Sequence, residues 1–134
     1  MARVTTDEVI RYGKITYQML KPEEVQDEID TATAIVDFES PPDDSRRSAR
    51  AEPLRAKAEL LLAVAGCYRK LSPFQWKAFP AKEILSTPGL TSGADFPTAE
   101  QAYAAMLKVA DAYEEEANKV LARIRPVTSG FEAG

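Results

Sequence analysis

A stretch of nine residues, Leu60 to Tyr68, contains no charged side chain and constrains the fold more than any other part of the sequence. It belongs to a helical pattern that Pro53 can open and that runs to about Leu71. A helix that is apolar on nearly every side must be surrounded by other elements, so we expect it in the middle of a bundle. Gly66 within it costs about 1 kcal/mol relative to Ala, which indicates a closely approaching neighbour.

Two shorter helices are predicted before this one. Thr5-x-x-Glu8 is a capping box for the first, and Gly13 is placed to stop it just beyond its last turn. The segment 15–20 that follows fits either an extended or a helical conformation. The second helix opens at Pro22 and ends near Phe38, because a Ser-Pro-Pro sequence follows. Its apolar residues form one narrow stripe: Val25, Ile29, Ala32 and Val36.

The last predicted helix has the clearest pattern. Thr98-x-x-Gln101 is a capping box, and the helix runs from Ala99 to Arg125, before Pro126. Its apolar seam alternates by three and four residues: Tyr103, Met106, Ala110, Tyr113, Ala117, Val120 and Ile124. The alternating small residues permit a close helical partner. At about 1.5 Å per residue this helix is roughly 40 Å long, which is more than such a domain usually needs to close its own core.

The connections differ in character. Residues 40–52 are polar and are predicted to form a loop. Residues 72–97 hold four of the nine prolines and several aromatic residues, and are predicted to form a long loop. Within it, 82–86 fits a short strand, which leaves room for a short β-hairpin, or one helical turn. Residues 127–134 are predicted to be a flexible tail. The expected fold is all-α: one domain over 1–134, resembling a four-helix bundle, with a long C-terminal helix and an elaborated Pro-rich loop.

The composition argues against catalysis and metal binding. The chain has no histidine, which excludes histidine-based catalysis and most zinc sites. Its one cysteine, Cys67, lies in the most apolar stretch, where a thiol is inert. No phosphate-binding glycine loop or nucleophile elbow is present. We therefore expect no catalytic residue, no cofactor and no metal ion, and not an enzyme. The longest apolar run is too short to span a membrane, so we expect a protein made in the cytoplasm without a membrane partner.

Local charge is more informative than the net charge of −4. Residues 22–39 contain seven acidic and no basic side chains, whereas 46–57 are strongly basic. Opposite patches on one chain suit head-to-tail association, which can close into a ring. The alternative is two unrelated solvated patches. The candidate acidic interface, which the resemblance described below would make a channel face, comprises Glu23, Glu24, Asp27, Glu28, Glu114 and Glu115.

The candidate contacts with another subunit combine arginines and aromatic residues. Arginine is a favoured partner of carboxylates, and aromatic residues carry much interface energy. The aromatic residues of the long loop fit equally well as a plug at the end of the bundle. The candidate contact residues are Arg46, Arg47, Arg50, Arg55, Phe74, Trp76 and Phe131.

In its order of elements, the chain resembles the head–tail connector (adaptor) family of tailed bacteriophages. The resemblance covers roughly residues 5–125. It rests on the opening turn at 5–10, the Pro22-Glu-Glu-Val25 helix with its apolar stripe, the apolar helix Leu54 to Leu71, and the long closing helix Ala99 to Arg125. Members are small, acidic and mostly helical proteins that assemble as a ring beneath the portal. The loop 72–97 is longer than in a minimal member.

The resemblance implies a structural virion protein. It implies a homo-oligomeric ring of about twelve copies that joins the portal to a tail or stopper protein. DNA would pass through the ring without sequence-specific binding, because an acidic channel wall repels phosphate. The alternative from another class is a small helical regulatory or protein-binding module that acts as a monomer, or as a dimer through the final helix.

Overall fold

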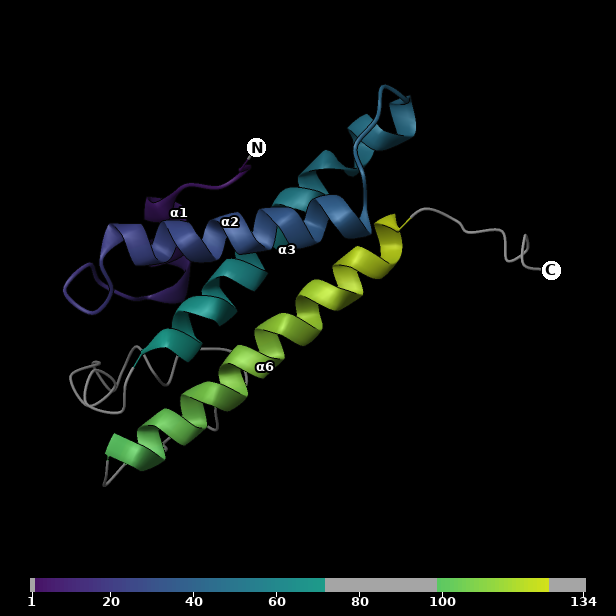
Figure 1. Ribbon diagram of the computed structural model, residues 1–134. Helices are drawn as coiled ribbons and strands as arrows, with labels where there is room; N and C mark the ends of the chain where they lie inside the picture. Colours follow the sequence, from purple (N-terminus) through teal and green to yellow (C-terminus); the bar gives the residue numbers. More distant parts are fainter. Residues whose placement is uncertain (1, 72–98, 126–134) are drawn as a thin grey trace.

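The structure, a computed structural model, describes residues 2–71 and 99–125. In this part the chain forms four α-helices and no strand, which confirms the all-α prediction (Figure 1). The helices are α1 (Thr6–Gly13), α2 (Pro22–Glu39), α3 (Arg46–Lys70) and α6 (Ala99–Ile124). The long loop and hairpin expected in 72–97, the tail 127–134 and the capping residue Thr98 lie outside the described residues.

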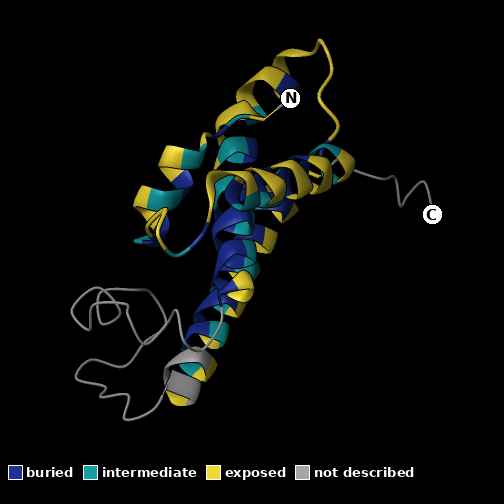
Figure 2. Cartoon of the chain, turned by 60° about the vertical axis from the view of Figure 1, so that its left-hand side comes forward, coloured by how far each residue is buried: buried dark blue, intermediate teal, exposed yellow. Residues whose placement is uncertain are grey.

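The apolar helix α3 lies in the middle of the bundle, as its sequence predicts. The helices α1, α2 and α6 all pack against it, and Figure 2 shows that its buried residues lie mainly from its middle to its C-terminal end. The predicted close approach at Gly66 is confirmed, and the neighbour is the side chain of Glu28. A Cβ atom added at Gly66 would lie 2.9 Å from the Glu28 Cδ. The absence of a side chain at this position therefore lets α2 and α3 approach each other.

The short helix α1 begins as predicted and ends differently. The Thr5 hydroxyl accepts a hydrogen bond from the Glu8 N–H, and the Glu8 carboxylate accepts from the Thr5 N–H, which completes the capping box. The left-handed residue at the other end is Lys14 (φ 57°) and not a glycine, so the prediction for Gly13 was wrong. Gly13 is instead a buried contact point with α3, where its carbonyl accepts a hydrogen bond of 2.7 Å from the Tyr68 hydroxyl.

The helix α2 matches its prediction. It begins at Pro22, and the four residues of its predicted stripe are all at most 1% exposed. The segment 15–20 before it is neither a strand nor a helix. Its backbone turns through hydrogen bonds from the N–H groups of Met19 and Leu20 to the carbonyl of Thr16. This turn brings Leu20 into the core.

The seam of α6 faces α3 of the same chain. Met106, Ala110 and Ala117 are fully buried there, and Tyr113 packs edge-on against Tyr68 with ring centroids 5.7 Å apart. Figure 1 shows α6 running beside α3 along most of its length. The expectation that so long a helix exceeds the needs of its own core stays a prediction, although the seam is buried in the bundle between Met106 and Ala117.

The start of α3 is the main correction to the predicted elements. We expected a loop over 40–52 and a helix from Pro53, but the helix begins at Arg46 and contains Pro53. The Ser45 hydroxyl caps the helix by accepting a hydrogen bond of 3.0 Å from the Ser48 N–H. The helix continues through Pro53 although an internal proline costs about 3 kcal/mol. Arg55, just beyond Pro53, donates a hydrogen bond of 2.7 Å to the Ser48 carbonyl in the first turn of the helix.

Candidate functional site

A pocket of about 420 Å³ lies where the C-terminal ends of α2 and α6 meet the N-terminal end of α3. A smaller apolar cluster of Val36, Ala58 and Leu121 lies at the same end of the bundle. Among the described residues, five arginines and a single carboxylate line the pocket. We call it the arginine pocket, and its charged residues are Arg47, Arg50, Arg55, Arg123, Arg125 and Asp43.

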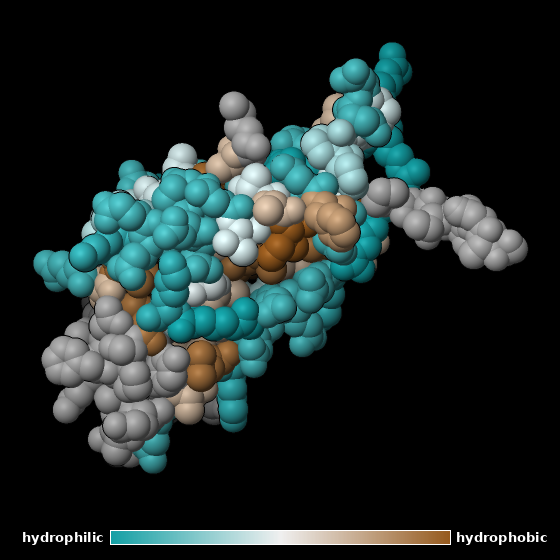
Figure 3. Space-filling view, viewed as in Figure 1, coloured by the Kyte–Doolittle hydropathy of each residue, from teal (hydrophilic) through white to brown (hydrophobic). Residues whose placement is uncertain are grey.

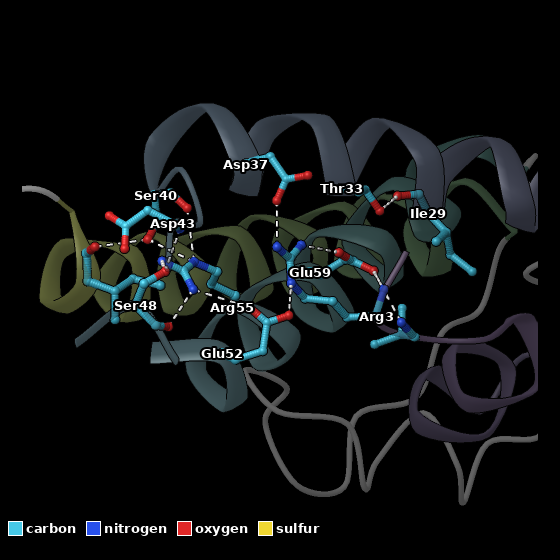
Figure 4. Close-up of polar contacts among 12 residues, drawn as sticks. Arg3, Ile29, Thr33, Asp37, Ser40, Asp43, Ser48, Glu52, Arg55 and Glu59 are labelled. Carbon is cyan, nitrogen blue, oxygen red and sulfur yellow. Dashed lines mark hydrogen bonds and ion pairs between the residues drawn. The ribbon is translucent and has the colours of Figure 1, made fainter. Parts of the chain in front are cut away.

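Arg55 is the buried arginine of this pocket, with 3% of its surface exposed (Figure 4). Its Nε donates to the carbonyl and hydroxyl oxygens of Ser40, at 2.9 and 3.1 Å. Its Nη1 donates to the Ser48 carbonyl and to Glu52, and its Nη2 donates once, to the Ser48 hydroxyl at 3.1 Å. Arg55 therefore ties the end of α2 to the first two turns of α3. One Nη2–H has no acceptor within the described ranges.

The four other arginines divide into paired and unpaired groups. Arg125 forms an ion pair of 2.6 Å with Glu39, which joins the ends of α6 and α2. Arg47, Arg50 and Arg123 are exposed and form no ion pair or side-chain hydrogen bond with residues 2–71 or 99–125. The same is true of Arg46, which precedes them on α3 but does not line the pocket. Unpaired guanidinium groups at one end of the molecule form a strongly positive surface.

Asp43 is the only carboxylate among the described lining residues, and it already accepts a hydrogen bond. Its Oδ1 accepts a hydrogen bond of 2.7 Å from the Ser45 N–H. Hydrogen bonds from the side chain and backbone of Ser45 lower the pKa of the Asp43 carboxyl below its usual value. The carboxylate thus stays charged and stabilises the N-terminal end of α3.

A second buried network adjoins the pocket and holds the N-terminal segment (Figure 4). Glu59, fully buried on α3, accepts hydrogen bonds from the backbone N–H groups of Arg3 and Val4, at 2.7 and 3.2 Å. The Arg3 guanidinium pairs with Glu59, with Asp37 and with Glu52. Burial lowers the pKa of Arg3, but these hydrogen bonds outweigh it and raise the pKa above its usual value. Glu52 also pairs with Arg55, so the two networks are continuous.

The predicted acidic face is only partly free. Glu28 pairs with Lys70 at 3.1 Å, and Glu24 accepts the Lys21 N–H at the start of α2. On α6, Glu114 pairs with Arg69 and Glu115 with Lys119. Glu23 and Asp27 are exposed and their carboxylates are unpaired in the described part of the chain. We call these two residues the acidic end, about 25 Å along α2 from the arginine pocket at a rise of 1.5 Å per residue.

The C-terminal half of α2 also carries apolar surface. Phe38 is 81% exposed and Ile35 is 40% exposed, which makes them the most exposed large hydrophobic residues among those described. Figure 3 shows this apolar surface beside the polar end of the molecule. An exposed aromatic residue next to charged side chains is typical of surfaces that bind other proteins.

The described residues give no support to thiol chemistry or metal binding. Cys67 is buried, and burial raises the pKa of its thiol to about 12, so the thiol stays protonated and unreactive. Among the described residues, no group of three or more acidic, cysteine or histidine side chains is arranged to hold a metal ion. None of the described helices is long and apolar enough to cross a membrane.

The predicted contact residues differ in their exposure. Arg46, Arg47 and Arg50 lie together on the surface, whereas Arg55 is buried within the chain and is unavailable to another subunit. Phe74, Trp76 and Phe131 lie outside the described residues. Sequence reasoning missed Arg123 and Phe38. The sequence could have indicated Phe38, because this residue lies off the buried stripe of α2. It could not have indicated Arg123, because the position of Arg123 in the pocket depends on how three helix ends meet.

Comparisons with known proteins add no assignment. No family model, no curated protein and no solved structure matches the chain.

Proposed function

We propose that this protein is a structural protein that associates head to tail with copies of itself and forms a ring, as the connectors of tailed phages do. In that role the ring sits in the virion between the portal and a tail or stopper protein, and DNA passes through it. The observation that carries the proposal is the separation of unpaired charges. Arg46, Arg47 and Arg50, which we call the basic end, lie far along the molecule from the acidic end.

The position of the two ends suits a repeating contact. The basic end lies on the first turns of α3, beyond the C-terminal end of α2, and the acidic end lies on the first turns of α2 (Figure 1). Since the two charged ends lie at different places on the molecule, they can contact two neighbours in a head-to-tail arrangement or one antiparallel partner related by a two-fold axis. A head-to-tail arrangement pairs each basic end with the acidic end of the next copy.

The exposed hydrophobic residues of α2 support the same proposal. Phe38 and Ile35 lie on the helix that carries the acidic end, toward the basic end. Burial of an aromatic side chain supplies affinity that surface charges alone do not. The contact would then combine a charged pair of surfaces with an apolar anchor.

The alternative of a dimer through the final helix receives less support. Between Met106 and Ala117 its seam residues are at most 5% exposed, so this part of the seam offers little surface to a second copy. A regulatory module that works as a monomer remains the competing proposal, and its distinguishing property is the mass of the native particle.

The mass of the purified full-length protein in solution tests the proposal. We expect light scattering to detect a particle many times heavier than the 14.7 kDa chain, which becomes smaller as salt is added. Replacing Arg46, Arg47 and Arg50 with Glu should prevent assembly. The variant should still fold, because acidic residues are favourable in the first turns of a helix.

The matched control makes the same change of charge elsewhere. Arg11, Lys108 and Lys119 are exposed on other surfaces, so replacing these three with Glu should leave the particle intact. A wild-type protein that stays a single chain, with or without its virion partners, would refute the proposal. Equal loss of assembly in both triple variants would show that net charge, and not the basic end, controls it.

A further inference from the structure

We propose that the arginine pocket is a binding site for phosphate groups. This proposal goes beyond the self-association described above and does not depend on it. A pocket of about 420 Å³ falls within the usual range for small-ligand sites. Its walls carry the unpaired guanidinium groups of Arg47, Arg50 and Arg123.

The buried side of the pocket is preorganised for an anion. Arg55 is held in one position by its hydrogen bonds to Ser40, Ser48 and Glu52. Its remaining Nη2–H has no acceptor within residues 2–71 and 99–125. A buried charged donor without an acceptor is costly, and an oxyanion in the pocket would satisfy it.

The helix ends around the pocket favour a ligand with several oxygen atoms. The pocket includes the N-terminal end of α3, where the N–H groups of Arg46 and Arg47 have no acceptor within the helix. The positive end of the helix dipole adds to the charge of the arginines. Arginine forks bind phosphate in a bidentate way, and a phosphate group offers more acceptor oxygens than one carboxylate. Asp43 opposes an anion, but its hydrogen bond from Ser45 occupies one of its oxygens.

The phosphate can come from a free ligand or from a nucleic-acid backbone, and both present the same chemistry to the pocket. Calorimetric titration of the full-length protein with sodium pyrophosphate, at constant ionic strength, measures the affinity of the pocket for phosphate groups from either source. We expect saturable binding that weakens about tenfold in Arg50→Gln and in Arg123→Gln, because each removes a charge-assisted hydrogen bond.

Arg46→Gln is the matched control. Arg46 is an exposed arginine next to Arg47 in the first turn of α3, but it does not line the pocket. The pyrophosphate affinity of Arg46→Gln should therefore differ from that of the wild type by less than about twofold. The same variants separate this proposal from the previous one. Arg46→Gln weakens self-association and not pyrophosphate binding, whereas Arg123→Gln weakens pyrophosphate binding and not self-association. Unfolding curves confirm that each variant is folded.

Two further titrations identify the source of the phosphate. If single-stranded DNA binds, is displaced by pyrophosphate and loses affinity in the same two variants, the backbone is a ligand. If only pyrophosphate shows this dependence, the ligand is a free phosphate compound. Both outcomes support the proposal. It is overturned if pyrophosphate does not bind, if Arg46→Gln weakens binding as much as Arg123→Gln does, or if only a poly-glutamate peptide binds in the pocket.

Discussion

At the scale of single residues, arginines of similar sequence context take different roles. Arg55 lies five positions after Arg50, yet it is buried and donates to two serines and a glutamate. Arg50 is exposed and has no ion-pair partner in the described part of the chain. Burial of a guanidinium is tolerated only where its donors find acceptors. The difference arises because Arg55 lies on the face of α3 that meets the end of α2.

Removal of the Arg55 side chain tests this structural role. Arg55→Gln should destabilise the protein by about 2–4 kcal/mol, because the carbonyls of Ser40 and Ser48 lose buried donors. Arg46→Gln, the exposed control, should change stability by less than about 0.5 kcal/mol. Urea unfolding measures both. Equal stability of the two variants would mean that Arg55 does not hold the ends of α2 and α3 together.

Acid titration tests the network around Glu52. Burial raises the pKa of this carboxyl, but hydrogen bonds from Arg3 and Arg55 outweigh it and lower the pKa below the usual 4.5. The stabilisation by Glu52 is therefore complete above pH 4.5 and is lost as the pH falls through the lower pKa of the folded state.

Glu52→Gln should flatten the pH dependence of the unfolding free energy below pH 4.5. The effect should be less than about 1 kcal/mol, because Glu52 is half exposed to solvent. Glu116→Gln, on the exposed side of α6, is the control and should keep the wild-type slope. An unchanged slope in Glu52→Gln would contradict the role assigned to the Arg3 and Arg55 contacts.

At the scale of helices, packing of α6 on α3 is the principal contact of the bundle. Ala110 and Ala117 are fully buried in it, and their small side chains leave room for α3. Ala110→Leu or Ala117→Leu should each destabilise the chain by about 1–3 kcal/mol through overpacking. Ala122→Leu, on the exposed face, is the control. If the seam were an interface between copies, these changes would alter the particle mass and leave the unfolding of the single chain unaffected.

The existence of the helices is predictable from the sequence, but the contacts between their ends are not. The stripe of α2, the seam of α6 and the apolar α3 follow from periodicity, which depends only on neighbouring residues. We predicted the start of α3 at Pro53 because proline suits a first turn, whereas the observed start at Arg46 depends on the Ser45 cap. The arginine pocket depends on how three helix ends meet, and no local pattern encodes that meeting.

At the scale of the whole molecule, two groups of charges have no ion-pair partner within residues 2–71 and 99–125. The basic end and the acidic end lie at different places on one rigid bundle, so each can contact a different neighbour. Other charged residues near them are paired within the chain, as Glu28 is with Lys70 and Arg125 with Glu39. The unpaired groups are therefore the ones whose pairing should drive association.

The most direct test is the particle mass of a mixture of two charge-reversed variants. One variant carries Arg46→Glu, Arg47→Glu and Arg50→Glu, and the other carries Glu23→Lys and Asp27→Lys. Each alone has two ends of like charge and should remain at the 14.7 kDa of one chain. Mixed in equal amounts, they should recover the wild-type particle mass, because both kinds of contact again join opposite charges. If the mixture stays at the mass of single chains while the wild type assembles, these two ends do not meet in the assembly.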